Sequence, residues 1–478
     1  MISLSACTTL FKLGPDYERP ASSVSDQWYA DTSDLTDSGT VQKDWWRLFE
    51  DPQLNGYIDK ALLDNKNLQA ANARVLQARA LRAQAKSEYY PQIQANGERF
   101  RQGTSGTTAA TFFAGLRRTI ITGTVDASWE LDIFGRIARS NEAAQARLEE
   151  TIELKRATLI GILAEVARSY YEVRGAQKRI EITEKNIALQ EQTFGLIESL
   201  YQLGEASEFD LARAKGQLEL TRSRLPDLTG EMQAATFRLS VLIGQAPETL
   251  LEDMLASKPL PIPPNVVPTG LRSEILRRRP DVRAAERALA SATADIGVAV
   301  ANLYPNFSLT GSAGRSASAF EDLLERNSNL FNVRQAFNWP IFAGGALKSQ
   351  IQVEKAEAKE ALALYEQAIL DSLADTETAL TLYAKRLQTR NRLQESVDSS
   401  RRAAELARAL FDGGEEDFLA VLDAERELIS VEDELILSEV DTILNLISVY
   451  AALGGGWDTE QKIETPKASF LKRAFFSF

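Results

Sequence analysis

Residue types that commonly carry out chemistry are scarce in this chain of 478 residues, which has no histidine and a single cysteine, Cys7. Without histidine the chain lacks the commonest general base and the commonest zinc ligand, and it cannot form a Ser-His or Cys-His pair. One cysteine can form neither an internal disulfide nor a cysteine-based metal site. Asp and Glu are scattered over expected helical faces, and no glycine-rich phosphate loop follows a strand. These features argue against an enzyme and predict no bound metal.

The residue for which the sequence predicts a covalent modification is Cys7. It ends the string Leu4-Ser5-Ala6-Cys7, which resembles a bacterial lipobox, in which small residues admit the signal peptidase and the cysteine thiol is then lipidated. A stray cysteine in a flexible terminus is the alternative interpretation. Met1 to Ser3 cannot supply the charged and apolar regions of a signal peptide, so we expect the natural start to lie upstream.

The overall composition narrows the class of partner. A net charge of −13 argues against nucleic acid, because binding to phosphates requires a basic face. With 44% hydrophobic residues the chain can bury a large core, but no apolar run approaches the roughly 18 residues of a membrane-spanning helix. We therefore expect any contact with a membrane to be made by other elements.

The chain contains two copies of one structural half, about 210 residues apart. The matching strings, first copy against second, are NLQAA (67–71) and DVRAA (281–285), YYPQI (89–93) and LYPNF (303–307), WELDIFG (129–135) and FNWPIFA (337–343), and LYQLG (200–204) and LFDGG (410–414). This period is far longer than that of a solenoid repeat, so we interpret it as an internal duplication.

Four segments alternate between apolar and polar residues with the period of a β-strand, at about 92–100, 119–133, 306–313 and 331–341. They pair into two predicted hairpins, at about 92–133 and 306–342, whose long loops are rich in Gly, Ser, Thr or Asn. A half-buried sheet on a soluble core is the simpler interpretation. The strand lengths, the aromatic residues near the strand ends and the acidic, hydroxylated polar face instead favour membrane strands around a water-filled lumen.

Four strands cannot close a barrel, and open sheet edges are not tolerated in lipid. If these strands cross a membrane, the chain must therefore oligomerise. Two copies would supply eight strands, which side chains would fill, whereas three copies would supply twelve and leave a passage. A duct therefore favours a trimer.

The rest of the chain is predicted to be helical. No proline interrupts Arg136 to about Leu203, or about Leu347 to Phe411, and each run could extend ~100 Å as one helix. Shorter helices are expected at 54–90, 208–244, 272–304 and 417–453. In the second long run, apolar residues recur at alternating spacings of four and three, as in a coiled-coil seam. They are Ile369, Leu373, Thr376, Leu380, Tyr383 and Leu387.

Prolines and the repeat together predict five parts. These are an N-terminal linker and equatorial segment (1–53), a first repeat (54–250), a proline-rich joint (251–269), a second repeat (270–456) and a C-terminal tail (457–478). Each half offers one long helix and one pair of shorter helices stacked end to end. Three chains would therefore provide twelve helical columns that continue the twelve strands. We expect the segments outside the repeats to wrap the middle of the helical part.

In their order and spacing, several motifs make the chain similar to the lipoprotein branch of the TolC-like outer-membrane efflux ducts. Besides the residues around Cys7, they are GPDY (14–17), Trp45-Trp46 with Phe49 and Asp51-Pro52, WELDIFGR (129–136), RPDVRAAE (279–286) and ALGGGW (452–457). The resemblance implies an α+β membrane protein that forms a homotrimer. It would have a 12-stranded β-barrel in the Gram-negative outer membrane, a mixed equatorial region and a 12-helix periplasmic tunnel.

The same resemblance implies a passive exit duct in a tripartite efflux pump. The expected partners are a periplasmic adaptor protein and an inner-membrane transporter of the resistance-nodulation-division type. Outer-membrane lipid surrounds the barrel, and the lipid on Cys7 is the only attached group expected. The implied roles are multidrug efflux and antibiotic resistance.

The resemblance also places a periplasmic gate at the two helical turns, which contain Gly204 and Gly414. The string from Gly414 through Leu419 to Asp423 and Ala424 matches the turn that carries rings of Leu and Asp across the opening. Three-fold symmetry would bring three Asp423 carboxylates together, where they would repel one another and favour cations. Asp210 occupies the acidic position of the first turn.

The sequence departs from some relatives at two positions of this gate. In those proteins the counterpart of Asp210 accepts a hydrogen bond from a tyrosine and pairs with a basic residue on the neighbouring turn. Here these positions hold Phe411 and Glu416. That lock is therefore absent, and other contacts must close the gate.

Three alternatives remain on the sequence alone. A duct for metal ions or for type I protein secretion would use the same fold. Met1, Met232 and Met254 are too far apart in the sequence to suggest a path for soft metals. A periplasmic coiled-coil scaffold with surface hairpins belongs to another class of protein, and would not explain why both hairpins occupy equivalent places in the repeat.

Overall fold

A computed structural model describes residues 11–21, 25, 28–29, 36–37, 39, 42–105, 107, 117–264 and 266–457. Cys7 and the tail beyond residue 457 lie outside this part of the chain. The chain divides into two compact units. The first comprises residues 1–22, 72–153 and 283–368, and the second comprises residues 23–71, 154–282 and 369–478.

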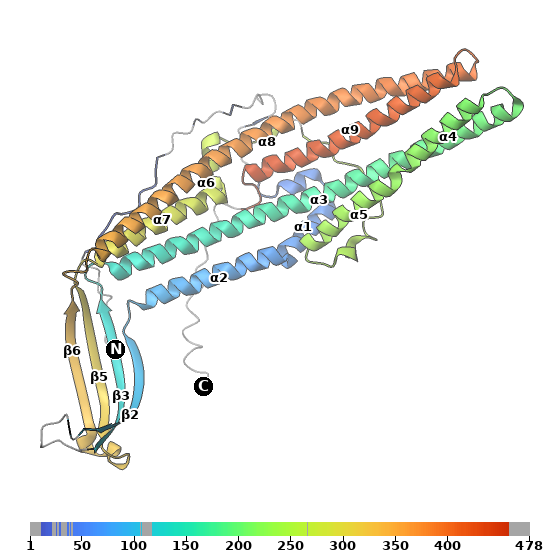
Figure 1. The fold of residues 1–478 in the computed structure, drawn as a ribbon. Coiled ribbons are helices and arrows are strands. Elements are labelled where there is room, and N and C mark those ends of the chain that lie inside the picture. The colour runs from blue at the N-terminus through green and yellow to red at the C-terminus, as the bar shows by residue number, and fades with distance from the viewer. Residues whose placement is uncertain are drawn as a thin grey trace. The chain divides into compact units, whose positions relative to one another are not determined.

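The first unit contains a four-stranded antiparallel sheet (Figure 1). Its strands, in spatial order, are β2 (Gln92–Gly103), β3 (Arg117–Leu131), β5 (Asn306–Ala317) and β6 (Asn329–Asn338). The predicted hairpins are thus both present, and β3 pairs with β5 to join them. The 3-10 turns η4 (Glu321–Leu324) and η5 (Arg326–Ser328) lie in the second hairpin loop.

Two strands end earlier than their alternation predicted. β6 ends at Asn338, because Pro340 has no N–H to donate to a neighbouring strand. Beyond this end, the Trp339 indole N–H donates to the Leu303 carbonyl at 3.0 Å. β3 ends at Leu131, where the chain turns and the Ile133 N–H donates to the Leu131 carbonyl at 2.8 Å. The Ile133 carbonyl instead accepts from the Phe11 N–H at 3.0 Å.

The strand register gives the sheet two chemically distinct faces. On one face lie rows such as Ile93, Ala127, Gly311 and Val333, which are mutual partners across the four strands. The opposite face carries rows such as Gln94, Asp126, Ser312 and Asn332. The predicted alternation of apolar and polar sides is therefore confirmed in three dimensions.

The N-terminal segment is fixed to the helical part of the first unit by Arg139, whose side chain is 1% exposed. Its guanidinium donates to the carbonyls of Leu13 at 2.9 Å and Gly14 at 3.0 Å, and pairs with Asp16 at 3.0 Å. Gly14 has φ +84°, and a Cβ there would come within 2.5 Å of the Gly297 Cα atom. This close approach explains why glycine opens the GPDY motif.

Two helices have the predicted length. α3 (Arg136–Leu203) and α8 (Ala346–Asp412) are continuous, and each contributes residues to both units. In the seam predicted on α8, Thr376, Leu380, Tyr383 and Leu387 are buried, while Ile369 and Leu373 are half-buried. α9 (Phe418–Ala452) also matches its predicted span.

The other three predicted helices are each broken. They appear as α1 (Pro52–Asp64) and α2 (Lys66–Ser87), α4 (Glu208–Arg222) and α5 (Arg224–Leu242), and η3 (Arg272–Glu274), α6 (Ile275–Arg278) and α7 (Pro280–Ala301). The prediction of single helices was wrong here for local reasons. Asn65 is extended and caps α2, Pro226 cannot bond to the Arg222 carbonyl, and Pro280 holds Arg279 out of the helical region.

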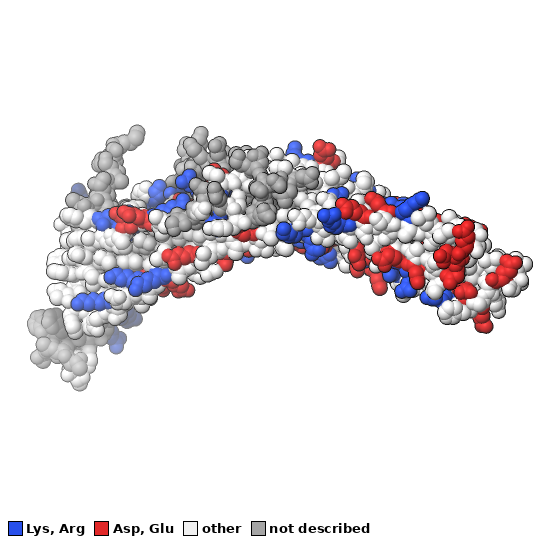
Figure 2. All heavy atoms as spheres, turned by 90° about the horizontal axis from the view of Figure 1, so that it is seen from above, with Lys and Arg blue, Asp and Glu red and all other residues white. Residues whose placement is uncertain are grey.

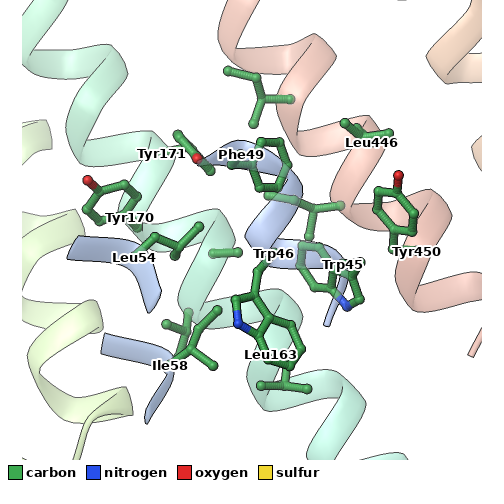
Figure 3. Close-up of a cluster of buried hydrophobic side chains, with 14 of the residues drawn as sticks. Trp45, Trp46, Phe49, Leu54, Ile58, Leu163, Tyr170, Tyr171, Leu446 and Tyr450 are labelled. Carbon is green, nitrogen blue, oxygen red and sulfur yellow. The ribbon is translucent and has the colours of Figure 1, made fainter. Parts of the chain in front are cut away.

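The largest core lies in the second unit, around η1 (Trp45–Phe49). Trp45 stacks on Tyr450 of α9 with ring centroids 5.5 Å apart, and Phe49 packs on Tyr171 of α3 at 5.1 Å (Figure 3). After η1, the Asp51 carboxylate caps α1 and also accepts from the Tyr170 hydroxyl. The aromatic motif at 45–52 therefore joins three helices in one core.

Three further short elements lie in the described part of the second unit. β1 (Thr36–Asp37) pairs in parallel with β4 (Val267–Pro268), and η2 (Pro247–Leu250) follows α5. The pairing of β1 with β4 was not predicted, because two-residue strands have no detectable period.

The most apolar described helix is α9, whose best 18-residue window has a mean hydropathy of 1.5. By length and composition this helix could cross a membrane, so the prediction that the chain has no such apolar run was wrong. However, 56% of that window is buried within the chain, against the core around η1. Packing inside the protein therefore accounts for its hydrophobicity.

Candidate functional site: two helical turns with one backbone geometry

The two turns that hold the predicted gate residues end α3 and α8 in the same way. The N–H of Gly204 donates to the Tyr201 carbonyl, and the next N–H donates to the Leu200 carbonyl. Gly414 and its successor repeat this pattern with the carbonyls of Phe411 and Leu410. These are Schellman motifs, which need a residue with positive φ. Gly204 has φ +80° and Gly414 has φ +70°, so glycine suits both positions.

The helices that follow the turns are capped differently. Ser207 and Asp210 form a capping box at the start of α4, with the Asp210 carboxylate accepting from the Ser207 N–H at 3.2 Å and from its hydroxyl at 2.5 Å. At the start of α9, the Asp417 carboxylate accepts from the Ala420 N–H at 3.1 Å. Asp210 is thus engaged within its own turn.

A small apolar cluster holds the two turns together. Ile197 of α3 and Ala214 of α4 pack with Phe418, Val421 and Leu422 of α9. Phe411, at the end of α8, is half-buried and lies 5.8 Å from the Phe418 ring centre to centre. At this position the aromatic ring thus makes an apolar contact rather than a hydroxyl hydrogen bond.

Leu419 and Asp423 lie one turn apart on α9 and are exposed. Leu419 is 39% exposed, and the side chain of Asp423 is 60% exposed and 3.8 Å from Arg426. Their neighbours Val421 and Leu422 are buried in the cluster, so the helix presents Leu419 and Asp423 away from it. Glu416 is exposed in the turn itself.

The turns carry a one-sided charge. Neither residues 186–212 nor residues 409–425 contain Lys or Arg, and acidic side chains gather at the right-hand end of Figure 2, where the turns lie. The acidic residues of these segments are Glu191, Glu198, Glu205, Glu208, Asp210, Asp412, Glu415, Glu416, Asp417, Asp423 and Glu425. Such a field attracts cations and repels anions. No group of residues that could hold a metal ion is found within the described ranges.

Two polar residues near the turns were missed by sequence reasoning. Gln190 of α3 is 4% exposed, and neither atom of its amide finds a hydrogen-bond partner in the described structure. Glu425 of α9 is partly buried, and this burial raises the pKa of its carboxyl, opposed by Arg408. Both line a cavity of about 440 Å³ between α3, α8 and α9.

A signal for Gln190 was present in the sequence, whereas none marked Glu425. Asn186, Gln190, Thr193 and Ile197 are buried and recur at spacings of four, three and four. This is the seam pattern that was recognised only in α8. Two of these seam residues, Asn186 and Gln190, line the cavity.

Comparison with known proteins identifies the architecture. A family profile described as "Outer membrane efflux protein" matches residues 57–245 and 271–455. The cation efflux system protein CusC of Escherichia coli strain K12 is 31% identical over 463 residues, 95% of this chain and 97% of CusC. The solvent efflux pump outer membrane protein SrpC of Pseudomonas putida is 30% identical, over 96% of this chain and 98% of its own.

Among solved structures, the outer-membrane channel OprN superimposes with a TM-score of 0.87 and 34% identity, covering 93% of this chain and 99% of OprN. The duplicated halves, the long helices and the four-stranded sheet are the shared architecture. The chain therefore belongs to the outer membrane efflux protein family, and it is a non-enzymatic outer-membrane channel with the TolC-like fold.

Proposed function

We propose that this chain is the exit duct of a tripartite efflux pump and works as a homotrimer. The observation that carries this proposal is the pair of unpaired edges of the sheet. β2 and β6 are the outer strands, and nearly all their residues are exposed. Phe331 of β6, for example, is 85% exposed. Unpaired edges with apolar side chains need further strands in a membrane.

Three copies would satisfy these edges if β6 of each copy paired with β2 of the next. The twelve strands would form one barrel, with the apolar face toward lipid and the polar face toward a water-filled lumen. On the polar face the Asp126 carboxylate accepts from Asn96 at 2.5 Å and Thr124 at 3.0 Å, so neighbouring polar side chains hold this carboxylate in place.

The proposed periplasmic gate is the ring of turns. With three-fold symmetry, Leu419 and Asp423 of each copy would narrow the opening. Three Asp423 carboxylates would repel one another, so the closed state requires other contacts. The cluster of Phe411 with Phe418, and the capping box of Asp210, support closure by packing of the turns rather than by an inter-turn ion pair. Glu416 would add charge at the entrance.

The proposed partners follow from this placement. A periplasmic adaptor would contact the turns, and an inner-membrane transporter of the resistance-nodulation-division type would drive the transport. Cys7, outside the described residues, would carry a lipid anchor. Replacing Cys7 with Ala is expected to leave the trimer intact, because the barrel itself provides insertion. Loss of the trimer would show that the lipid does more than anchor the chain.

We propose drugs or other small toxic compounds as the exported class. The names of the relatives cover different cargoes, a cation for CusC and a solvent for SrpC. This variety supports a duct that conducts what the inner-membrane transporter selects. A cation path is the second candidate, because the turns are strongly acidic.

The mass of the detergent-solubilised protein tests the assembly. Light scattering with the detergent contribution subtracted should give about three times the 52.8 kDa chain. A monomer or dimer that stays in solution without detergent would contradict the shared barrel and favour a coiled-coil scaffold.

A further inference from the structure

The strand register places arginines unevenly on the two faces of the sheet. Arg99, Arg101, Arg117 and Arg315 all lie on the face that carries Ile93, Val125 and Leu309, as their partners across the ladder show. The acidic residues of the four strands, Glu98, Asp126 and Glu130, all lie on the opposite face. The mainly apolar face therefore carries only positive charge within the strands.

These arginines are also confined to one end of the sheet. From the helical end, the apolar face begins with rows containing Leu131, Phe307 and Phe337, and continues to the row of Val125 and Phe331. Arg315 stands beside Gly123, and Arg99, Arg101 and Arg117 follow toward the hairpin loops. The loop end is the end of the sheet drawn lowest in Figure 1.

The spacing fits the thickness of a bilayer. Leu131 and Gly123 are eight residues apart on β3, so about 27 Å of strand separates their rows. A tilt of about 40° reduces this to about 20 Å along the membrane normal, close to the height of the apolar band of a barrel. The arginines then lie where the hydrocarbon ends and the lipid headgroups begin.

Three of the four arginines have no ion-pair or side-chain hydrogen-bond partner among the described residues. Arg99, Arg101 and Arg117 are exposed, and no described residue forms an ion pair or side-chain hydrogen bond with them. Arg315 is partly engaged, since its guanidinium donates to the Leu323 carbonyl at 3.1 Å. Three cations on an apolar face have no counter-ion in the described chain. We therefore expect an anionic group from outside the chain to neutralise them.

We propose that Arg99, Arg101 and Arg117 bind the phosphate groups of the glycolipid in the outer leaflet of the outer membrane. The guanidinium fork matches phosphate oxygens in two-point hydrogen bonds, and the apolar rows below it accommodate acyl chains. The helical end of the sheet faces the periplasm, so the loop end meets the outer leaflet. This inference rests on the proposed barrel, with its apolar face toward lipid.

The test uses the full-length trimer in detergent and purified lipid A as the probe. Native mass spectrometry measures lipid binding to the unmodified protein and to R99Q/R101Q. Each arginine near a phosphate is expected to raise the affinity about fivefold, so the double variant should bind lipid A about 25-fold more weakly. Lipid A without its phosphates should bind the unmodified protein more weakly still than lipid A binds this variant, because the variant keeps Arg117.

The chain offers a close control, because Arg117 and Arg118 are neighbours on β3 that point to opposite faces. R117Q should weaken binding about fivefold, while R118Q should leave it unchanged. Equal losses in both variants would overturn the proposal, since net charge alone would then explain the binding. So would unchanged binding in R99Q/R101Q, or equally tight arginine-dependent binding of phosphatidylglycerol.

The mass of each variant separates this inference from the proposed function. If R99Q/R101Q and R117Q remain trimers and conduct ions in planar bilayers, any change in lipid binding concerns the lipid site. A failure of the unmodified protein to form a trimer would instead count against the barrel.

Discussion

The two helical turns share a backbone but differ in how their acidic residues are used. Both end in a Schellman motif with a glycine of positive φ. In the first turn, the Asp210 carboxylate is hydrogen-bonded to Ser207, whereas Asp423, a full turn beyond the start of α9, is exposed. Duplication has therefore kept the geometry while allowing the electrostatics of the copies to diverge. The second turn is the one whose side chains remain available to an opening.

The largest expected difference between the turns is in conductance. L419A/D423A should raise the single-channel conductance several-fold in planar bilayers, because it removes both bulk and charge from the proposed ring. D210A should leave the conductance near that of the unmodified channel, since that carboxylate is occupied in the capping box. Unchanged conductance in L419A/D423A would place the constriction elsewhere.

Replacing the turn glycines tests whether the backbones are equivalent. Gly414→Ala and Gly204→Ala should each lower the free energy of unfolding by about 1–2 kcal/mol, because both residues have left-handed backbone angles. Chemical unfolding in detergent measures the loss. Gly413→Ala is the matched control, since Gly413 does not have positive φ and its added Cβ would have room. A similar loss in the control would exclude φ as the cause.

The two helix caps should contribute similar stability but differ in how strongly their residues depend on each other. Ser207→Ala and Asp417→Ala should each cost about 1 kcal/mol of helix stability. In the first turn S207A and D210A should be non-additive, because the two side chains bond to each other's backbone. Hydrogen exchange of the amides in the first turns of α4 and α9 measures each effect. Strict additivity of S207A and D210A would contradict a reciprocal box.

The smallest expected effect concerns Glu425, which lies beyond the second turn. Burial raises the pKa of its carboxyl, so between the ordinary pKa of Glu and the raised value the folded state holds a proton that the unfolded state has released. The stability contributed by this group is full below the ordinary pKa of Glu and is lost as the pH rises through the raised value. Glu425→Gln should therefore raise the melting temperature at neutral pH by roughly 1–2 °C and flatten its fall with pH.

Glu427→Gln is the control for this measurement, since Glu427 is exposed on the same helix. It should leave the pH dependence of the melting temperature unchanged. If Glu425→Gln had no effect on that dependence, another group would have to account for it.

The elements that could be predicted from the sequence are those whose signals are local and extend over many residues. The unbroken alternation around Trp129 located β3, and the absence of proline gave the ends of α3 and α8 to within a residue. Prediction failed where one residue decides, as at Asn65, whose amide donates to the Leu242 carbonyl far along the chain. A side chain that bonds across 177 positions leaves no periodic trace.

The gate residues show the same difference between local sequence signals and contacts made by distant residues. Leu419, Asp423 and Gly414 could be named from a motif, because family resemblance follows local spacing. The cavity lined by Gln190 and Glu425 could not, because it exists only where α3, α8 and α9 meet. Whether a polar residue is buried depends on neighbours that the sequence does not bring together.

By itself the sequence determined the duplication, the class of the long helices and strands, the lack of enzyme chemistry and the family, since all of these depend on residue types and their spacing. Only the tertiary structure decided which carboxylates are occupied, such as Asp210, and which are exposed, such as Asp423. It also decided, through strand register, that Arg99 and Arg101 of β2 share a face with Arg117 of β3 and Arg315 of β5. A register shift of one residue would separate these arginines onto opposite faces, so only the paired strands could assign them.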